Sequence, residues 1–91
     1  VEGFDRAKGA FIITTKSDAV CEKLSQTFEN GITMIDAKGY YSGSKKTMIY
    51  FVINRFQVDK MKRLVHDIDP KAYISINEIA DVYSANSDDK D

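Results

Sequence analysis

The sequence predicts a single α+β domain in which two helices pack on one face of a four-stranded antiparallel sheet. Three observations lead to this prediction. The length of 91 residues suits one domain, and 43% apolar residues suffice to fill a core. Four segments have the β-branched and aromatic composition of strands. Two others repeat apolar residues at the helical period, and the six segments follow the order βαββαβ.

The first strand and the first helix are expected at the start of this order. Residues 8–15 (KGAFIITT) have the composition of a strand that ends at a polar cluster. We expect Ser17 or Asp18 to cap the following helix by accepting a hydrogen bond from a backbone N–H. The apolar stripe of this helix consists of Val20, Cys21, Leu24 and Phe28. Gly31 is expected to end the helix in the left-handed conformation.

The second and third strands are expected next. Residues 32–41 (ITMIDAKGYY) begin as a strand and are expected to decay into a loop at residues 38–39. Residues 42–46 (SGSKK) have the composition of a turn. Residues 47–53 (TMIYFVI) are the strongest strand candidate, because β-branched and aromatic side chains fill most of the segment.

The second helix and the fourth strand complete the order. Asn54 and Gln57 have the spacing of a capping box before this helix. The apolar residues at helical spacing are Met61, Leu64, Val65 and Ile68. Pro70 ends the helix, and residues 72–76 (AYISI) alternate as a strand. The whole order is that of a ferredoxin-like sandwich, a split βαβ fold.

The C-terminal end carries weaker signals. A last short element, helix or strand, is expected around Ile79, Val82 and Tyr83. Residues 84–91 (SANSDDKD) have the composition of a disordered polar tail. We therefore expect one ferredoxin-like domain over residues 1–83, followed by that tail.

Charge and cysteine content exclude several classes of function. Thirteen Lys and Arg against fourteen Asp and Glu give a formal net charge of −1, which argues against a broad basic surface for nucleic acid. The single cysteine excludes an internal disulfide and a cysteine-rich zinc site, and it fits a reducing compartment. The longest apolar run, residues 48–53, is far shorter than a membrane span, and the N-terminus has no signal-peptide pattern.

The face of the sheet opposite the helices is expected to be apolar as well. In residues 47–53 both alternating sets of side chains are apolar, which is typical of a strand buried on both faces. Monomers rarely leave so large an apolar face uncovered. We therefore expect a homo-oligomer, with interface candidates Met48, Tyr50, Val52 and Ile12. The alternative is that residues 78–83 fold back over this face.

Three groups of residues stand in a specific order along the chain. They are residues 2–8 (EGFDRAK) followed by FII at 11–13, GIT at 31–33 followed by Asp36, Lys38-Gly39, Tyr41 and Gly43, and residues 67–73 (DIDPKAY). Together they resemble the C-terminal soluble domain of YitT-type bacterial membrane proteins. Tyr40 departs from the pattern, which usually has a second Gly there, and Ala80, Asp81 and Ser84 replace an expected His, Glu and Gly.

This resemblance implies a ferredoxin-like fold similar to that of the PII signal proteins, which assemble as oligomers and sense small ligands. It also implies a soluble domain on the cytoplasmic side of the cell membrane. The partner would be the N-terminal transmembrane region of the parent protein. The family's biochemical activity is uncharacterised.

The strongest candidate site lies between the second and third strands. Glycines let backbone N–H groups approach an anion, lysines supply positive charge, and tyrosine rings can stack on a base. The candidate ligand-binding residues are Asp36, Lys38, Gly39, Tyr40, Tyr41, Gly43, Lys45 and Lys46. The alternative is a plain solvated turn, in which the same residue types serve only conformation.

Residues 38–41 (KGYY) also begin like the RNP1 signature of RNA-recognition motifs, which share a ferredoxin-like fold. The match ends there, because no Gly or Ala follows the first aromatic residue and no Phe-Val-x-Phe comes next. RNA binding through Tyr40 and Tyr41 is therefore the second hypothesis.

The remaining reactive residues favour no catalytic or metal site. Asp67 and Asp69 are too few for a metal cage, and we expect a solvated helix end there. His66 is expected to be exposed, without partners for zinc, and Cys21 to be a small buried hydrophobe. The sequence thus predicts a regulatory or oligomerisation domain that binds a small anionic, nucleotide-like ligand and uses no cofactor. An RNA-binding module or a weakly signalled enzyme are the alternatives.

Overall fold

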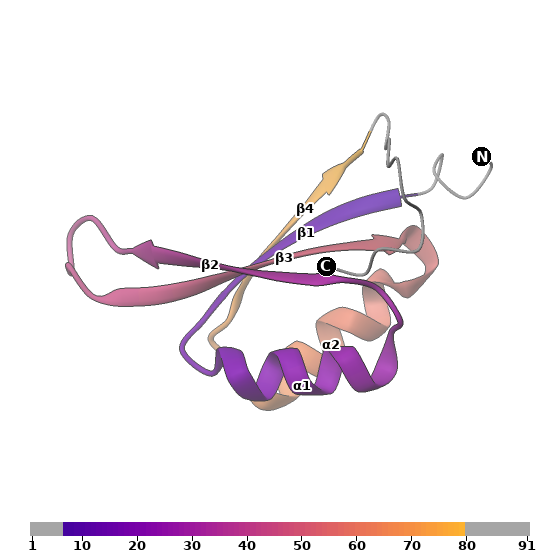
Figure 1. The fold of residues 1–91 in the computed structure, drawn as a ribbon, viewed down its shortest axis with the longest axis horizontal. Coiled ribbons are helices and arrows are strands. Elements are labelled where there is room, and N and C mark those ends of the chain that lie inside the picture. The colour runs from indigo at the N-terminus through magenta and orange to yellow at the C-terminus, as the bar shows by residue number, and fades with distance from the viewer. Residues whose placement is uncertain (1–6, 80–91) are drawn as a thin grey trace.

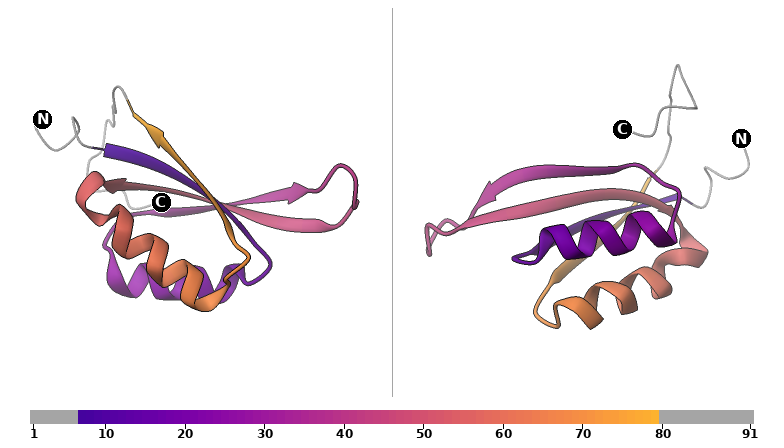
Figure 2. Two further views of the ribbon diagram at one scale, coloured as in Figure 1. Left: turned by 180° about the vertical axis from the view of Figure 1, so that it is seen from behind. Right: turned by 60° about the horizontal axis from the view of Figure 1, so that its bottom comes forward.

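The computed structural model describes residues 7–79 and has the predicted order of elements (Figure 1). The elements are β1 (Ala7–Thr14), α1 (Ser17–Thr27), β2 (Ile32–Lys38), β3 (Lys45–Asn54), the short 3-10 helix η2 (Arg55–Gln57), α2 (Val58–Ile68) and β4 (Tyr73–Glu78). The four strands form one antiparallel sheet in the order β2-β3-β1-β4. Both helices lie on the same face of the sheet, as Figure 2 shows from two sides. The predicted βαββαβ sandwich is therefore confirmed.

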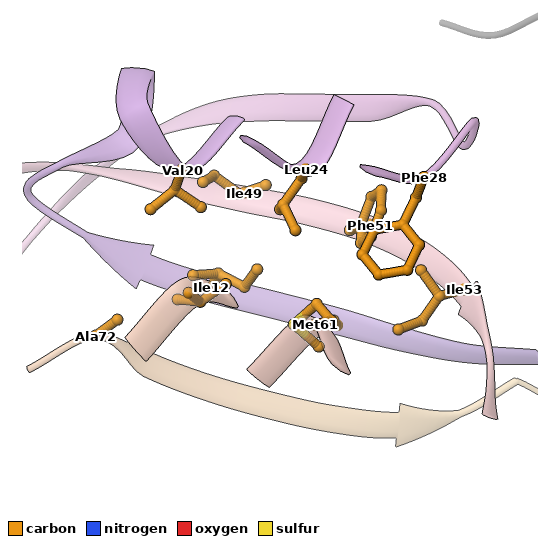
Figure 3. Packing of buried hydrophobic residues seen from close by; sticks show 11 residues of the cluster. Ile12, Val20, Leu24, Phe28, Ile49, Phe51, Ile53, Met61 and Ala72 are labelled. Carbon is orange, nitrogen blue, oxygen red and sulfur yellow. The ribbon is translucent and has the colours of Figure 1, made fainter. Parts of the chain in front are cut away.

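The hydrophobic core fills the layer between the sheet and the two helices (Figure 3). The strand register places Ile12 opposite Ile49, so these two residues share the face that the helices cover. The largest fully buried side chains are Phe51, Ile12, Leu24, Ile49, Ile53, Met61, Val20 and Val65. Burial of each contributes about 1.5–3 kcal/mol of hydrophobic free energy. The amphipathic stripes of α1 and α2 both face this layer, as their period predicts.

The start of α1 differs from the prediction. Lys16 occupies the N-cap position, and its side chain makes no capping hydrogen bond. The expectation that Ser17 or Asp18 caps the helix is therefore wrong, because the helix begins at Ser17 itself. The connection is held instead by Thr14, whose Oγ1 accepts a hydrogen bond from the Lys16 N–H at 3.0 Å. This hydroxyl ties the end of β1 to the residue that precedes the helix.

The end of α1 also differs. The chain leaves the helix through Phe28 in an extended conformation, and the Phe28 N–H donates to the Leu24 carbonyl at 2.8 Å. Among the described glycines only Gly43 has a positive φ, so the expected left-handed role of Gly31 is wrong. An extended exit needs no left-handed residue. The side-chain amide of Asn30 donates a hydrogen bond to a β3 carbonyl and so fixes the connection into β2.

The connection between β2 and β3 lies earlier in the chain than the predicted turn at residues 42–46, because β2 ends at Lys38 and β3 begins at Lys45 and not at Thr47. The turn is closed by two backbone hydrogen bonds. Gly39 N–H donates to the Ser44 carbonyl at 3.0 Å, and Gly43 N–H donates to the Gly39 carbonyl at 2.9 Å. Gly43 lies at φ 67°, which glycine adopts without the steric cost that a side chain brings.

The entrance to α2 confirms the capping box. Asn54 N–H donates to Gln57 Oε1 at 3.0 Å, and Phe56 N–H donates to Asn54 Oδ1 at 2.8 Å. These bonds cap the start of η2, which leads directly into α2. The sequence placed this signal correctly because both partners lie within four consecutive residues.

Ile79, the residue that follows β4, lies against the face of the sheet opposite the helices. Ile79 lies close to Gly9, where a Cβ atom would stand 3.4 Å from Ile79 Cδ1. This contact is where the alternative covering segment, residues 78–83, would begin. The expected element at Val82 and Tyr83 and the tail at residues 84–91 lie outside the described residues.

Candidate functional site

An open cavity of about 660 Å³ lies where the β2–β3 hairpin leaves the body of the domain, beside the start of α1. Three parts of the chain form it: the end of β1, the first residue of α1, and both strands of the hairpin. Its lining residues are Thr14, Thr15, Ser17, Asp36, Ala37, Lys38, Lys45, Lys46 and Thr47. Hydroxyl groups and ammonium groups therefore dominate its polar surface.

Positive charges in this cavity oppose each other directly. The register of β2 and β3 pairs Lys38 with Lys45 and Asp36 with Thr47 on the same side of the hairpin. Like charges directly opposite across two strands destabilise a sheet. The ion pairs found among the described residues, Lys8–Glu78 and Lys62–Asp59, include neither hairpin lysine. The cavity lining therefore carries three lysines against one carboxylate, Asp36, and its charge is positive.

The structure divides the eight predicted ligand-binding residues into two groups. Asp36, Lys38, Lys45 and Lys46 line the cavity together. The other four, Gly39, Tyr40, Tyr41 and Gly43, lie in the turn and are not part of the lining. The Tyr40 and Tyr41 side chains are 90% and 98% exposed, and their rings stand edge to face with centroids 5.1 Å apart. The two rings therefore lie outside the cavity and do not line the place where a ligand would bind.

The cavity also contains residues that sequence reasoning missed. Thr14, Thr15 and Ser17 come from the end of β1 and the start of α1, and Thr47 comes from β3. The polar cluster after the first strand was the available signal. A polar cluster after a strand is typical of a helix cap, and the hairpin that completes the cavity lies some twenty to thirty residues further along the chain.

A buried hydrogen bond supports this end of the domain. Thr14 Oγ1 donates to Asp69 Oδ2 at 2.6 Å, and the Lys71 N–H donates to Asp69 Oδ1 at 3.0 Å. The hydrogen bond from Thr14 lowers the pKa of Asp69 below its usual value, and the Lys71 N–H and the charge of Lys16 act in the same direction. The expectation that Asp69 belongs to a solvated helix end is wrong, because Asp69 is buried in this contact.

The other reactive side chains lie apart from the cavity. Asp67 and His66 are exposed, and His66 Nε2 lies 3.3 Å from the Ala72 carbonyl oxygen. Cys21 is half-buried against the core, where burial and the nearby Asp18 carboxylate raise the pKa of its thiol. Within residues 7–79 no three His, Cys, Asp or Glu side chains are grouped for a metal ion.

The face of the sheet opposite the helices is apolar at its centre. Phe11 and Tyr50 form a ring pair with centroids 5.0 Å apart, and Ile35 and Ile79 line the same shallow hollow. Met48, Tyr50 and Val52 lie on this face and are half-buried. We call the set of Phe11, Ile35, Met48, Tyr50 and Val52 the open-face patch.

Ile12 does not belong to the open-face patch. It is fully buried, and its register opposite Ile49 places it under the helices. The prediction of Ile12 as an interface residue is therefore wrong. Both alternating sets of side chains in β1 and β3 are apolar, so the sequence alone did not indicate which set faces the helices.

Comparison with known sequences now identifies the relatives of this domain. Residues 30–84 match the family described as "Uncharacterized protein conserved in bacteria (DUF2179)", which is more than half of the chain. The chain belongs to the DUF2179 family. This DUF2179 domain is 26% identical over 91% of its length to the UPF0750 membrane protein YxkD of Bacillus subtilis (strain 168). It is 31% identical over 81% of its length to the UPF0750 membrane protein YitT of the same organism.

The DUF2179 domain spans only part of these relatives, 30% of YxkD and 26% of YitT. The resemblance to YitT-type proteins that the sequence indicated is confirmed. Within residues 7–79 neither helix has the length and apolar character needed to cross a membrane.

Solved structures share the fold of the DUF2179 domain. A DUF2179 protein from Eubacterium ventriosum is 23% identical with a TM-score of 0.69, covering 80% of this chain and all 100% of that one. Arabidopsis thaliana PII bound to citrate is 16% identical with a TM-score of 0.75, covering 89% of this chain and 84% of that one. At these identities the likeness shows the fold alone, and it confirms the predicted ferredoxin-like, PII-like architecture.

Proposed function

We propose that this DUF2179 domain is a non-catalytic regulatory domain of a bacterial membrane protein, and that it binds a small anion in the cavity at the base of the β2–β3 hairpin. The directly opposed pair Lys38–Lys45 carries the proposal. An anion held between the two ammonium groups removes the repulsion that this pairing creates. The hydroxyl groups of Thr15 and Ser17 at the same cavity supply donors for further oxygen atoms of the ligand.

The relatives support both parts of this proposal. YxkD and YitT are membrane proteins more than three times as long as the matched part of this chain. We infer that the domain is connected to a transmembrane region and lies on its cytoplasmic side. The PII protein with the same fold was crystallised with citrate, a polycarboxylate anion. The PII structure supports a small anion as the class of ligand. The pair Lys38–Lys45 of this chain supports the cavity as the place where the ligand binds.

We also propose that the domain self-associates through the open-face patch. An apolar surface built on Phe11, Met48 and Tyr50 is costly to leave in water, at roughly 25 cal/mol for each Å². A second copy of the domain would cover it. The contact of Ile79 with Gly9 supports the competing arrangement, in which the chain's own C-terminal segment covers part of the same face.

Isothermal titration of the purified domain with citrate, inorganic phosphate and adenosine nucleotides tests the anion site. We expect binding by at least one of these anions and a loss of at least about ten-fold in affinity for the double variant Lys38→Ala, Lys45→Ala. The matched control is Lys23→Ala with Lys60→Ala, because both lysines are exposed on the helices, away from the cavity. No binding of any anion, or equal losses in both double variants, would contradict the proposal.

Sedimentation equilibrium over a range of micromolar concentrations tests self-association. We expect an oligomer that Tyr50→Lys converts to a monomer, because a charge at the centre of the patch opposes its burial. Lys62→Glu, on the outer face of α2, is the control and should leave the mass unchanged. A wild-type domain that stays monomeric at every concentration would contradict the proposed interface.

RNA binding is not part of the proposal. RNA-recognition motifs stack bases on aromatic residues of the sheet surface. Tyr40 and Tyr41 lie in the turn between β2 and β3, beyond the strands that would form such a surface. The exposed rings therefore offer no sheet platform for single-stranded RNA.

A further inference from the structure

The β2–β3 hairpin is an arm that extends beyond the layer of helices. Figures 1 and 2 show its outer half reaching past the start of α1, with neither helix beneath it. All side chains from residue 40 to residue 46 are exposed. The tip of the arm therefore projects away from the hydrophobic core into solvent.

Two adjacent tyrosines occupy this tip without a structural role in the turn. The turn is closed by backbone bonds of Gly39 and Gly43, and the Ser42 and Ser44 hydroxyls contact each other at 2.8 Å. The rings of Tyr40 and Tyr41 touch only one another among the aromatic contacts of the described residues. Neither ring lines the cavity behind the turn. Both rings are therefore available to an external partner.

Positive charge lies directly behind the two rings. Residues 36–46 contain three lysines and one aspartate, a net charge of +2, while the whole chain has a net charge of −1. Lys38, Lys45 and Lys46 are exposed and stand within the last residues of β2 and the first residues of β3. The arm therefore combines an aromatic tip with a cationic stem.

We propose that the tip of the β2–β3 hairpin docks on an anionic lipid surface. Tyrosine is suited to the headgroup layer, because its ring prefers the apolar side of that layer and its hydroxyl the aqueous side. Lysines a few residues behind the rings then lie at the height of the lipid phosphates and are attracted by the negative surface potential. The proposed connection of the domain to a transmembrane region would place a lipid surface near this tip. The inference rests on the proposed function for this location alone.

The composition of the tip favours lipid over a protein partner. A protein-binding hot spot needs a surrounding ring of contacts that excludes water from its aromatic anchors. The tyrosines here are flanked by glycine, serine and lysine, and no apolar neighbour extends the surface around them. A fluid headgroup layer needs no such ring, because it closes around the inserted side chains itself.

Vesicle co-sedimentation of the 91-residue chain tests this inference. We expect binding to vesicles of phosphatidylcholine with about one third phosphatidylglycerol, little binding to pure phosphatidylcholine, and release at high salt. The double variant Tyr40→Ser, Tyr41→Ser should lower the bound fraction at least about five-fold. Tyr73→Ser is the matched control, because Tyr73 is also exposed but lies on β4.

A second measurement separates this inference from the cavity proposal. The tyrosine double variant should keep its thermal stability and its titration with soluble anions, since both rings lie outside the cavity. Vesicle binding that is equal in the tyrosine double variant and in Tyr73→Ser overturns the inference, and so does the absence of any preference for the anionic vesicles. Neither result decides whether the cavity binds soluble anions, because the titration measures that binding separately.

Discussion

The hydroxyl of Thr14, at the end of β1, donates a hydrogen bond of 2.6 Å to Asp69 Oδ2, in the residue that follows α2. Both residues are buried. The same hydroxyl accepts from the Lys16 N–H, and Lys16 Nζ donates to the Ile68 carbonyl at 3.2 Å. One small cluster therefore joins the sheet, the start of α1 and the end of α2 beside the proposed anion cavity.

Removing the Thr14 donor should destabilise the domain. Thr14→Val keeps the shape of the side chain but leaves Asp69 Oδ2 without its buried donor, and an unsatisfied buried acceptor is costly. We expect a lower midpoint of urea unfolding at neutral pH. Thr33→Val, at an exposed position of β2, is the control and should change little. Equal midpoints for the two variants would contradict the structural role of this bond.

The cluster also predicts an acid-sensitive stability. The Thr14 hydrogen bond lowers the pKa of folded Asp69 below its ordinary value of 3.8. A group with a lowered folded-state pKa stabilises the fold above the unfolded pKa, and this contribution is lost as the pH falls through the folded value. Urea unfolding measured between neutral pH and pH 2 should therefore show a decline that is shallower in Asp69→Asn. The exposed Asp67→Asn should keep the wild-type slope.

The sequence predicted the fold well because local periodicity determines it. The helical spacing of Met61, Leu64 and Val65 and the capping box at Asn54 are readable within one turn of chain. The burial of Asp69 was not readable in the same way. Its partner Thr14 is 55 residues away, and only the folded sheet brings the two together. A carboxylate before a proline has the same local sequence whether it is solvated or buried.

The candidate site shows the same division. Lys38 and Lys45 were predicted together because seven positions of one hairpin separate them. The hydroxyls of Thr14 and Ser17 were not predicted as part of the site, because they come from another part of the chain. The prediction of Tyr41 as a ligand-binding residue met a third difficulty. Tyr41 is close to the lysines in the sequence, but the turn places it outside the cavity.

The core between α1 and the sheet should respond strongly to truncation. Leu24 is fully buried, and Leu24→Ala should lower the free energy of unfolding by about 2–5 kcal/mol, through lost burial and the cavity left behind. Lys23→Ala, at the neighbouring exposed position of the same helix, should stay within about 0.5 kcal/mol of wild type. Urea unfolding of both variants measures the difference. A small effect of Leu24→Ala would mean that α1 packs less tightly than the structure shows.

The turn of the arm should depend on Gly43. With φ at 67°, this residue lies in the left-handed region, where a Cβ atom costs roughly 1–2 kcal/mol. Gly43→Ala should therefore lower the free energy of unfolding by about 1 kcal/mol, and Gly43→Asn by less, because asparagine tolerates that region. Apart from Gly43 and its two neighbours in the chain, no residue has an atom within 4 Å of the added Cβ, so crowding does not contribute. Equal stability of wild type and Gly43→Ala, measured by urea unfolding, would contradict this turn geometry.

The lysine pair should lower stability in the absence of ligand. Lys38 and Lys45 stand directly opposite each other, so Lys45→Gln relieves a like-charge contact and should raise the free energy of unfolding by about 0.2–1 kcal/mol at low salt. The gain should fade at high salt, because the charges are exposed and screened. The same variant should weaken anion binding. Higher stability without ligand together with weaker anion binding is the result expected if Lys45 serves binding at a cost in stability. If Lys45→Gln is less stable than wild type at low salt, the two ammonium groups do not repel each other, and the argument for an anion between them fails.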